Sequence, residues 1–211
     1  MLMVEPSSFC NLRCPLCPSG NGTLTRQRGH MDLDGYRRLV DQTHRHVFMI
    51  MLWNQGEPFL NRHLSEMVRY AHDRRIFTCT STNGHFIEDP EAARAVVASG
   101  LDELIVSVDG MDQQTYARYR VGGDLERVFA GIGRLLAARA EAGASTPVVS
   151  LQFLAMRHNE AQLAAAHDTA RRLGVDKFLV KTTQVYSPEQ ADEYLPQQPA
   201  YRRYEATPGG S

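Results

Sequence analysis

Short apolar segments alternate along the chain with longer segments in which apolar residues recur every three or four positions. The short segments are rich in Val, Ile, Leu and Phe, which is typical of strands buried on both faces. They predict six strands, at residues 2–5, 48–53, 77–81, 103–108, 148–156 and 177–183.

The longer segments carry the start and stop signals of helices. Leu64, Met67, Val68 and Ala71 lie at i, i+3, i+4 and i+7 and so share one helix face. Three segments open at an aspartate, and three stop at a glycine, as helix caps do. Helices are therefore predicted within residues 32–46, 61–75, 89–100, 124–143 and 159–174.

Repeated strand–helix units indicate an α/β fold with a parallel sheet and right-handed crossovers. Six units are too few for the usual closed barrel of eight strands. We expect an open, partial six-stranded parallel β/α barrel, with a doubly wound sheet as the alternative. In both folds the ligand site lies at the carboxyl ends of the strands. One core domain is expected over residues 1–204, and residues 205–211 have the composition of a flexible tail or of a truncated end.

Composition excludes several classes of protein. The 211 residues have a formal net charge of −1 with acids and bases interspersed, so no nucleic-acid partner is expected. No apolar run approaches the roughly 20 residues that span a bilayer, and no secretion signal is recognised, so no membrane partner is expected. A cytoplasmic location follows by default, and thiols stay reduced there.

Three of the four cysteines lie within eight residues, in "FCNLRCPLCP", at Cys10, Cys14 and Cys17. A structural zinc site needs four ligands, and His30 is a candidate for the fourth, but no second C-x₂-C arm exists. Three thiols on a four-iron cluster leave one iron without a protein ligand, where chemistry can occur. Cys79 lies inside a predicted strand and is interpreted as a buried apolar residue.

The spacing C-x₃-C-x₂-C after a first strand resembles the signature of the radical S-adenosylmethionine (radical SAM) superfamily. The resemblance implies a TIM-like partial barrel in which Cys10, Cys14 and Cys17 hold a [4Fe–4S] cluster. It also implies that the open iron binds the amino and carboxylate groups of S-adenosylmethionine. Relatives often have an aromatic residue before the last cysteine, where this chain has Leu16.

The segment "NQGEPFLN" after the second predicted strand resembles the GGEP-type motif of this family. Gly56, Glu57 and Pro58 match the motif, while Gln55 replaces its first glycine. The resemblance implies that this segment contacts the amino group of the methionine moiety. Taken alone, Gly-Glu-Pro is equally typical of a turn.

Polar residues also follow the third and fourth predicted strands. The segment "STNG" resembles one that lies beside the ligand in relatives, which implies contacts from Ser81, Thr82 and Asn83. In "SVDG", alternation places Ser107 and Asp109 on one face, toward the barrel interior. The resemblance implies contacts to the methionine carboxylate and the ribose, although Asp109 also suits the cap of a following helix.

Three further polar residues are candidates. Arg120 resembles an arginine that pairs with the methionine carboxylate in relatives. Gln152 interrupts an apolar strand, and a ribose or adenine is a suitable partner for a buried amide. Lys181 either faces a substrate or exits to solvent. Trp53 is expected in the core, and the histidines other than His30 show no ligand spacing.

These motifs predict a radical SAM enzyme in which reductive cleavage of S-adenosylmethionine gives methionine and a 5′-deoxyadenosyl radical that abstracts hydrogen from a substrate. The substrate is a small molecule or a peptide, and the electron donor is of the flavodoxin or ferredoxin type. The chain is most similar to the SPASM subgroup, yet no cysteine follows Cys79 to form that group's C-terminal extension. A non-catalytic scaffold that binds an iron–sulfur cluster or zinc is the alternative.

Overall fold

The computed structural model of the chain describes residues 1–203. Within them, six strands form one sheet in the order β1-β2-β3-β4-β5-β6, and every neighbouring pair is parallel. The strands are β1 (Leu2–Met3), β2 (Met49–Met51), β3 (Phe77–Thr82), β4 (Glu103–Ser107), β5 (Val148–Ala155) and β6 (Lys177–Thr182). The helices are α1 (Pro18–Asn21), α2 (Leu33–Thr43), α3 (Leu64–His72), α4 (Pro90–Ala98), α5 (Gln113–Tyr119), α6 (Leu125–Glu141), α7 (Leu163–Leu173) and α8 (Pro188–Tyr194), with 3₁₀ turns at Pro58–Leu60, Glu160–Gln162 and Pro199–Tyr201.

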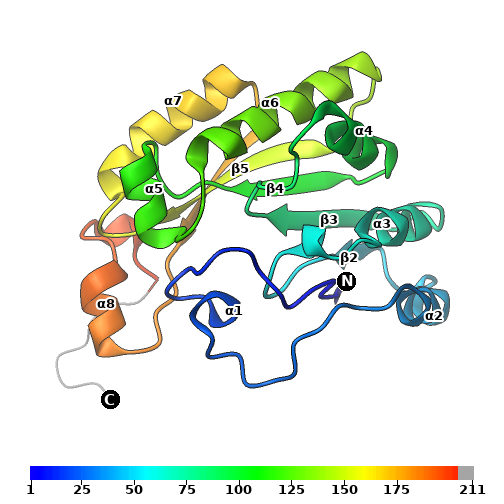
Figure 1. Ribbon diagram of the computed structural model, residues 1–211, viewed down its shortest axis with the longest axis horizontal. Helices are drawn as coiled ribbons and strands as arrows, with labels where there is room; N and C mark the ends of the chain where they lie inside the picture. The colour runs from blue at the N-terminus through cyan, green and yellow to red at the C-terminus, as the bar shows by residue number, and fades with distance from the viewer. Residues whose placement is uncertain (204–211) are drawn as a thin grey trace.

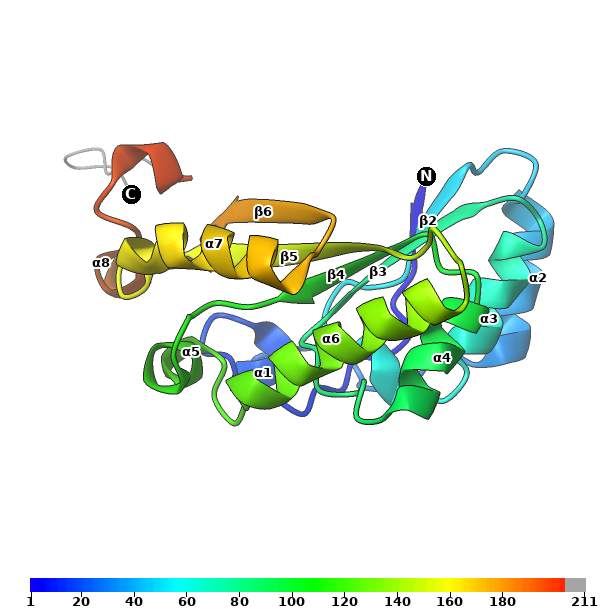
Figure 2. The same cartoon turned by 90° about the horizontal axis from the view of Figure 1, so that it is seen from above.

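The predicted open, partial β/α barrel is confirmed, and its two faces are covered differently. Alternate strand residues such as Ile50, Leu104 and Leu151 are fully buried and form the main core with the helices. Helices α4, α6 and α7 lie on this side of the sheet, whereas α1 and its loop lie on the other (Figure 1). Helices α5 and α8 lie at the end of the molecule opposite α2 and α3 (Figures 1 and 2).

The predicted helix caps form as the sequence indicates. The carboxylates of Asp32, Asp89 and Asp124 accept hydrogen bonds from the backbone N–H groups three residues on, at 2.8, 2.8 and 3.1 Å. Gly100 and Gly174 end α4 and α7 with φ of 83° and 75°, a region that favours glycine. These caps fix where each helix meets the sheet.

The first two strands are shorter than predicted. Strands were expected over residues 2–5 and 48–53, yet the ladder is lost soon after β1. The Val4 N–H still donates to the Met51 carbonyl at 2.9 Å, but Pro6 has no N–H with which to continue. The chain then enters a long segment, residues 4–32, that we call the cysteine loop.

Helices α1, α5 and α8 were not predicted. For α5 the signal is present, because Asp112 caps it through the Thr115 N–H at 2.8 Å and Tyr116 and Tyr119 are buried on one face. The alternative that Asp109 caps this helix is therefore wrong.

A second, smaller hydrophobic cluster lies beneath the cysteine loop, and we call it the loop core. The Tyr194 ring from α8 packs edge-on against the Tyr119 ring from α5, with centroids 6.3 Å apart. Residues far apart in sequence thus support the cysteines: the buried members are Leu12, Cys14, Leu16, Tyr119, Met156 and Tyr194.

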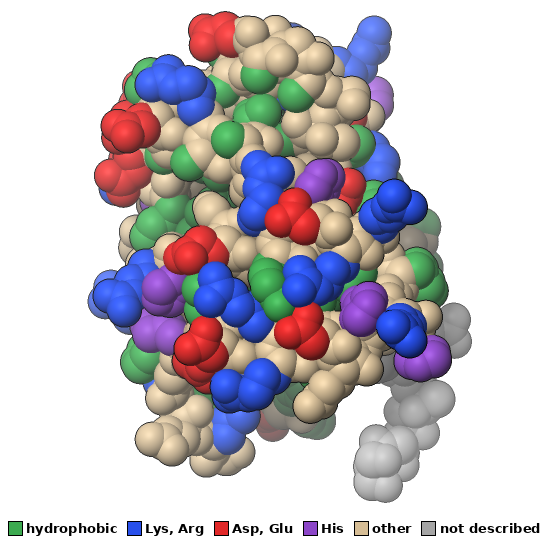
Figure 3. Space-filling model, turned by 90° about the vertical axis from the view of Figure 1, so that its right-hand side faces the viewer, with side chains coloured by type: hydrophobic (Ala, Val, Ile, Leu, Met, Phe, Trp, Pro, Cys, Tyr) green, Lys and Arg blue, Asp and Glu red, His purple; other side chains and the backbone are tan. Residues whose placement is uncertain are grey.

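The surface carries charges of both signs. Figure 3 shows Lys and Arg side chains next to Asp, Glu and His on the face formed by the α2–α3 end. Among the described residues, no helix has the length and apolar character needed to cross a membrane. The predicted tail, residues 205–211, lies outside the described residues.

Candidate cofactor site

The cysteine loop carries three free thiols close together. Cys14 is buried, and Cys10 and Cys17 are half-buried. Burial raises the pKa of the Cys14 thiol to about 11, and the nearby Cys17 and Cys10 act in the same direction. Burial also raises the pKa of Cys10. Because metal binding requires thiolates and releases protons, a bound metal is what would hold these sulfurs deprotonated.

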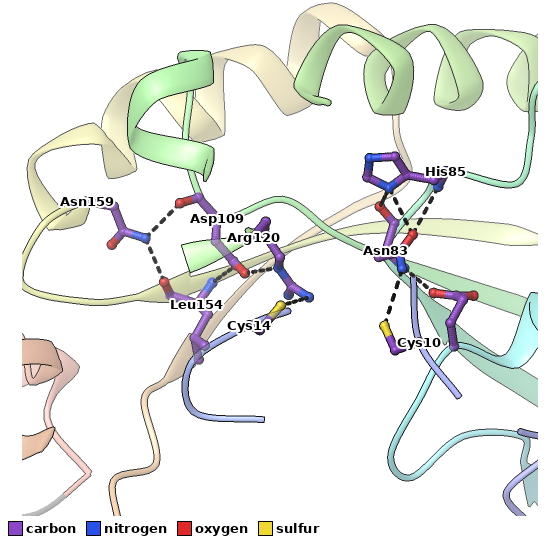
Figure 4. A network of polar contacts seen from close by, with 9 residues as sticks. Cys10, Cys14, Asn83, His85, Asp109, Arg120, Leu154 and Asn159 are labelled. Carbon is purple, nitrogen blue, oxygen red and sulfur yellow. Dashed lines mark hydrogen bonds and ion pairs between the residues drawn. The ribbon is translucent and has the colours of Figure 1, made fainter. Parts of the chain in front are cut away.

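Each of the three sulfurs lies near a polar side chain from another part of the fold, and two of these side chains are predicted cofactor residues. The Cys10 Sγ is 3.9 Å from Asn83 Nδ2, which follows β3, and the Cys14 Sγ is 3.9 Å from Arg120 Nη1, which follows α5 (Figure 4). The predicted ligands and two predicted cofactor residues are thus brought together at the carboxyl ends of the strands.

Gly56 allows the loop after β2 to approach the cysteine loop. Its φ is +77°, and a Cβ atom there would lie 2.4 Å from the Ser7 carbonyl oxygen and 2.7 Å from that of Phe9. The Glu57 N–H donates to the same Phe9 oxygen at 2.7 Å. Pro58 follows at the first position of a 3₁₀ turn. Only glycine fits at position 56, and the motif thereby packs against the backbone of the residues that precede Cys10.

The Glu57 carboxylate is buried and ties β3 to this turn. Its oxygens accept hydrogen bonds from the Thr82 hydroxyl at 2.8 Å, the Asn83 N–H at 2.8 Å and the Phe59 N–H at 3.2 Å. Burial nevertheless raises the pKa of Glu57 to about 7, since these hydrogen bonds offset only part of the lost hydration. Thr82, predicted beside the ligand, donates its hydroxyl hydrogen to Glu57, and its contact with a ligand stays a prediction.

His85 orients the Asn83 amide, a role that the sequence did not suggest. The Asp124 N–H donates to His85 Nε2 at 2.8 Å, so the proton of the neutral ring is on Nδ1. Burial lowers the pKa of His85 and favours this neutral form. Nδ1 then donates to Asn83 Oδ1 at 2.9 Å (Figure 4). Asn83 Nδ2 donates to Asn11 Oδ1 in the cysteine loop at 2.7 Å.

A buried ion pair links β4 to the end of α5. Asp109 is fully buried; its Oδ2 accepts from Arg120 Nε at 2.5 Å and its Oδ1 from the Leu154 N–H at 2.8 Å. Asn159, also missed by the sequence reasoning, bridges the Asp109 and Leu154 carbonyls at 3.0 Å each. With both carboxylate oxygens engaged, Asp109 orients Arg120 toward Cys14 (Figure 4).

A cavity of about 360 Å³ opens beside Cys17 on the inner face of the barrel. Trp53, expected in the core, is only partly buried and lines this cavity instead. The cavity is lined by Leu16, Cys17, Pro18, Trp53, Gln55, Ser81, Ile105, Tyr119, Gln152, Leu154, Lys181, Thr182, Gln184, Tyr186 and Arg203.

The remaining candidates lie along this inner face. Ser81, Gln152 and Lys181 all line the cavity, and Ser107 pairs with Gln152 in the sheet register. Ser107 is buried, and its hydroxyl makes no hydrogen bond to any part of the chain that the structure describes. Contact of these residues with a cofactor stays a prediction.

The donor set fits an iron–sulfur cluster better than a single ion. Within residues 1–203, no three His, Cys, Asp or Glu side chains are grouped to hold one metal ion. His30, the proposed fourth zinc ligand, is exposed and its ring lies 5.0 Å from that of Phe9. A four-iron cluster takes each thiolate on a different iron, so its ligands need not converge on one point. The zinc alternative therefore gains no support from these residues.

The chain matches a known protein family and several curated proteins. A sequence profile described as "Radical SAM superfamily" matches residues 4–154. The tungsten-containing aldehyde ferredoxin oxidoreductase cofactor-modifying protein of Pyrococcus furiosus is 27% identical over 200 residues, covering 92% of this chain and 54% of that protein. A probable GTP 3′,8-cyclase of Methanococcus maripaludis is 30% identical over 166 residues, covering 78% of this chain and 53% of that protein.

Solved structures share the fold at low identity. Streptococcus suis SuiB bound to S-adenosylmethionine superposes with a TM-score of 0.75 at 16% identity, covering 93% of this chain and 43% of that chain. SuiB has also been solved with its precursor peptide SuiA. The chain spans about half the length of the curated relatives described above.

Proposed function

This chain belongs to the radical SAM superfamily, and we propose that it is the core of an enzyme that cleaves S-adenosylmethionine reductively at a [4Fe–4S] cluster. When bound, these groups supply an electron and a carbon–sulfur cleavage that yields methionine and a 5′-deoxyadenosyl radical, which takes a hydrogen atom from the substrate. The observation that carries the proposal is the placement of three free thiols beside a cavity at the carboxyl ends of the strands.

The chain's own residues have three tasks in this proposal. Cys10, Cys14 and Cys17 hold the cluster. Glu57 fixes the turn beneath them through its three hydrogen bonds. Arg120, oriented by its ion pair, keeps a guanidinium available for a carboxylate, for which its planar donors are suited.

We propose that the other predicted cofactor contacts come from the inner face. Gly56 and Pro58 shape the turn that faces the methionine amino group, and Asn83 presents its amide to the same rim. Ser107 and Gln152 supply a hydroxyl and an amide for the ribose or adenine. Asp109 acts through Arg120, because both of its oxygens are already engaged.

We propose a small molecule or a peptide as the substrate and a flavodoxin- or ferredoxin-type protein as the electron donor. The superfamily includes the cyclase named for GTP and SuiB, solved with a peptide, so substrate class differs among relatives. All four cysteines are free thiols, which suits a reducing compartment such as the cytoplasm. Membership of the SPASM subgroup stays a prediction.

The test is anaerobic reconstitution with iron and sulfide, followed by dithionite and S-adenosylmethionine with chromatographic detection of 5′-deoxyadenosine. We expect about four irons per chain, as a four-iron cluster requires, together with 5′-deoxyadenosine formation. Iron binding without any cleavage product would favour the scaffold alternative and refute the enzyme proposal.

The matched pair of variants is Cys14→Ala and Cys79→Ala. Both remove one buried thiol, but Cys79 lies within β3 and outside the cysteine loop. We expect Cys14→Ala to lose the iron and Cys79→Ala to keep it. Equal iron loss in both variants would contradict the assignment of the ligands.

A further inference from the structure

Gln55 occupies the position where the related motif has a glycine, and its side chain reaches the cysteine loop. Its Oε1 atom lies 3.3 Å from the Cys17 Sγ. Asn83 and Arg120 approach the Cys10 and Cys14 sulfurs less closely, at 3.9 Å, and Cys10 Sγ also accepts a backbone N–H, that of Leu12, at 3.4 Å. Since glycine has no side chain, this contact depends on the residue in which this chain departs from the motif.

The position of Gln55 relative to the loop is fixed by Glu5. The Gln55 N–H donates to Glu5 Oε2 at 2.9 Å, and Arg26, beyond the cysteines in the same loop, donates to that oxygen at 2.6 Å. The Glu5 side chain is 14% exposed, whereas the Arg26 side chain is 48% exposed, so only the Glu5 side of this junction is largely protected from water. Glu5 therefore fixes the backbone of Gln55 relative to the cysteine loop, which carries Cys17.

The direction of this hydrogen bond depends on the state of the sulfur. As a thiol, Cys17 donates to the Gln55 carbonyl oxygen. As a metal-bound thiolate it has no proton and can only accept, while a glutamine amide offers both a donor and an acceptor. Within residues 1–203 the Gln55 side chain makes no other hydrogen bond, so turning the amide over breaks no second contact.

We propose that Gln55 donates a hydrogen bond through Nε2 to the Cys17 thiolate of the loaded cluster and thereby raises the cluster's reduction potential. A donor withdraws charge from the sulfur, which stabilises the more negative, reduced state. This inference rests on the proposed function, because it assumes that the cluster is bound by these three thiols. In this proposal Gln55 sets the potential at which the cluster accepts an electron and is not itself a ligand.

The experiment is a potentiometric titration of the reconstituted protein, followed by electron paramagnetic resonance (EPR), for Gln55→Met, Gln55→Glu and the parent. Methionine keeps the length of glutamine but has no N–H, and glutamate places an acceptor only. Gln184→Met is the matched control, because Gln184 lines the same cavity without contacting a cysteine. At a fixed applied potential we expect about a tenfold lower ratio of reduced to oxidised cluster in Gln55→Met, equivalent to about 59 mV for one electron. This ratio should be lower still in Gln55→Glu, and in Gln184→Met it should match that of the parent.

The outcomes separate this inference from the proposed function. A parent protein without a four-iron EPR signal would refute the proposed function itself and remove the basis of this inference. A parent with the signal, but with an unchanged potential in Gln55→Met, would overturn the Gln55 inference alone. If Gln55→Met does not load iron, the reduction potential of Gln55→Glu decides. The EPR spectrum of the parent's reduced cluster should also show coupling to an exchangeable proton, and this coupling must be absent from the spectrum of Gln55→Glu.

Discussion

Replacing Asp109 by asparagine tests whether the buried ion pair with Arg120 holds the site together. Asp109 is fully buried, its oxygen lies 2.5 Å from Arg120 Nε, and the Arg120 side chain is 15% exposed. Loss of one partner of a buried pair costs about 3–5 kcal/mol, and we expect about 3 because asparagine keeps an oxygen acceptor. In a domain of this size, 1 kcal/mol shifts Tm by about 2–4 °C, so the metal-free variant should melt about 6–12 °C lower.

In the cluster-loaded protein, Asp109→Asn should lower the melting temperature by less. A thiolate at Cys14, 3.9 Å from Arg120 Nη1, supplies part of the counter-charge that Asp109→Asn removes. Thermal unfolding followed by circular dichroism, under anaerobic conditions and with and without the cluster, measures both values. An equal loss in the two states would contradict the electrostatic reasoning.

The control is the pair Asp176–Arg139, which is built in the same way but is more exposed. Each aspartate accepts hydrogen bonds from an arginine and from a backbone N–H of β5, yet the Asp176 side chain is 35% exposed. Such pairs contribute roughly 0–1 kcal/mol. Double-mutant cycles with Arg120→Met and Arg139→Met should give clearly unequal coupling energies, and equal ones would refute the role of burial.

Three further predictions concern single residues. Gly56→Ala should lose iron binding and stability, because its Cβ would lie 2.4 Å from a backbone oxygen. The control is Gly22→Ala, at a similar φ of +80° but with no atom within 4 Å of the added Cβ. It should lower the free energy of unfolding by only about 1 kcal/mol and keep its iron. His85→Gln should raise KM for S-adenosylmethionine roughly fivefold, because it removes the hydrogen bond from the His85 ring to Asn83 Oδ1. His85→Asn keeps a donor near Nδ1 and should restore the parent's KM; equal values for both variants would contradict this. Burial raises the pKa of Glu57 from 4.5 to about 7, so the folded protein binds that proton more tightly than the unfolded chain. The free energy of unfolding should therefore fall as pH rises from about 4.5 to 7, and Glu57→Gln should remove about 3 kcal/mol of that fall, measured as Tm against pH.

Local patterns were sufficient to predict the sheet and most of its covering helices. Runs such as residues 103–108 are apolar, with one face buried and the other partly buried, and residues such as Asp89 and Asp124 form local caps. The sequence signal for each element therefore lies within a few residues of the element itself. The short elements were missed because their stability comes from partners far away. Helix α8 has seven residues and packs through Tyr194 on a loop at the other end of the sequence.

The site was predicted where residue type alone determines the chemistry. Three clustered thiols indicate a metal or cluster site without any knowledge of the fold, whereas the Gly-Glu-Pro segment indicates one only through its place after a predicted strand and its resemblance to a family motif. His85 was set aside because it has no ligand spacing, and its partner Asp124 lies 39 positions away. The Gln55–Cys17 contact spans 38 positions and likewise leaves no periodic signal.

The loop core also sets an order of events during biosynthesis. Leu12 and Leu16 leave the ribosome early, but their partner Tyr194 follows about 180 residues later. At about 5–20 residues per second, that interval is roughly 10–40 s. During it, the three thiols have left the ribosome while the packing that holds them is incomplete. Cluster insertion therefore belongs after synthesis of α8, and until then protecting the nascent thiols from oxygen and stray metal is a task for the cell.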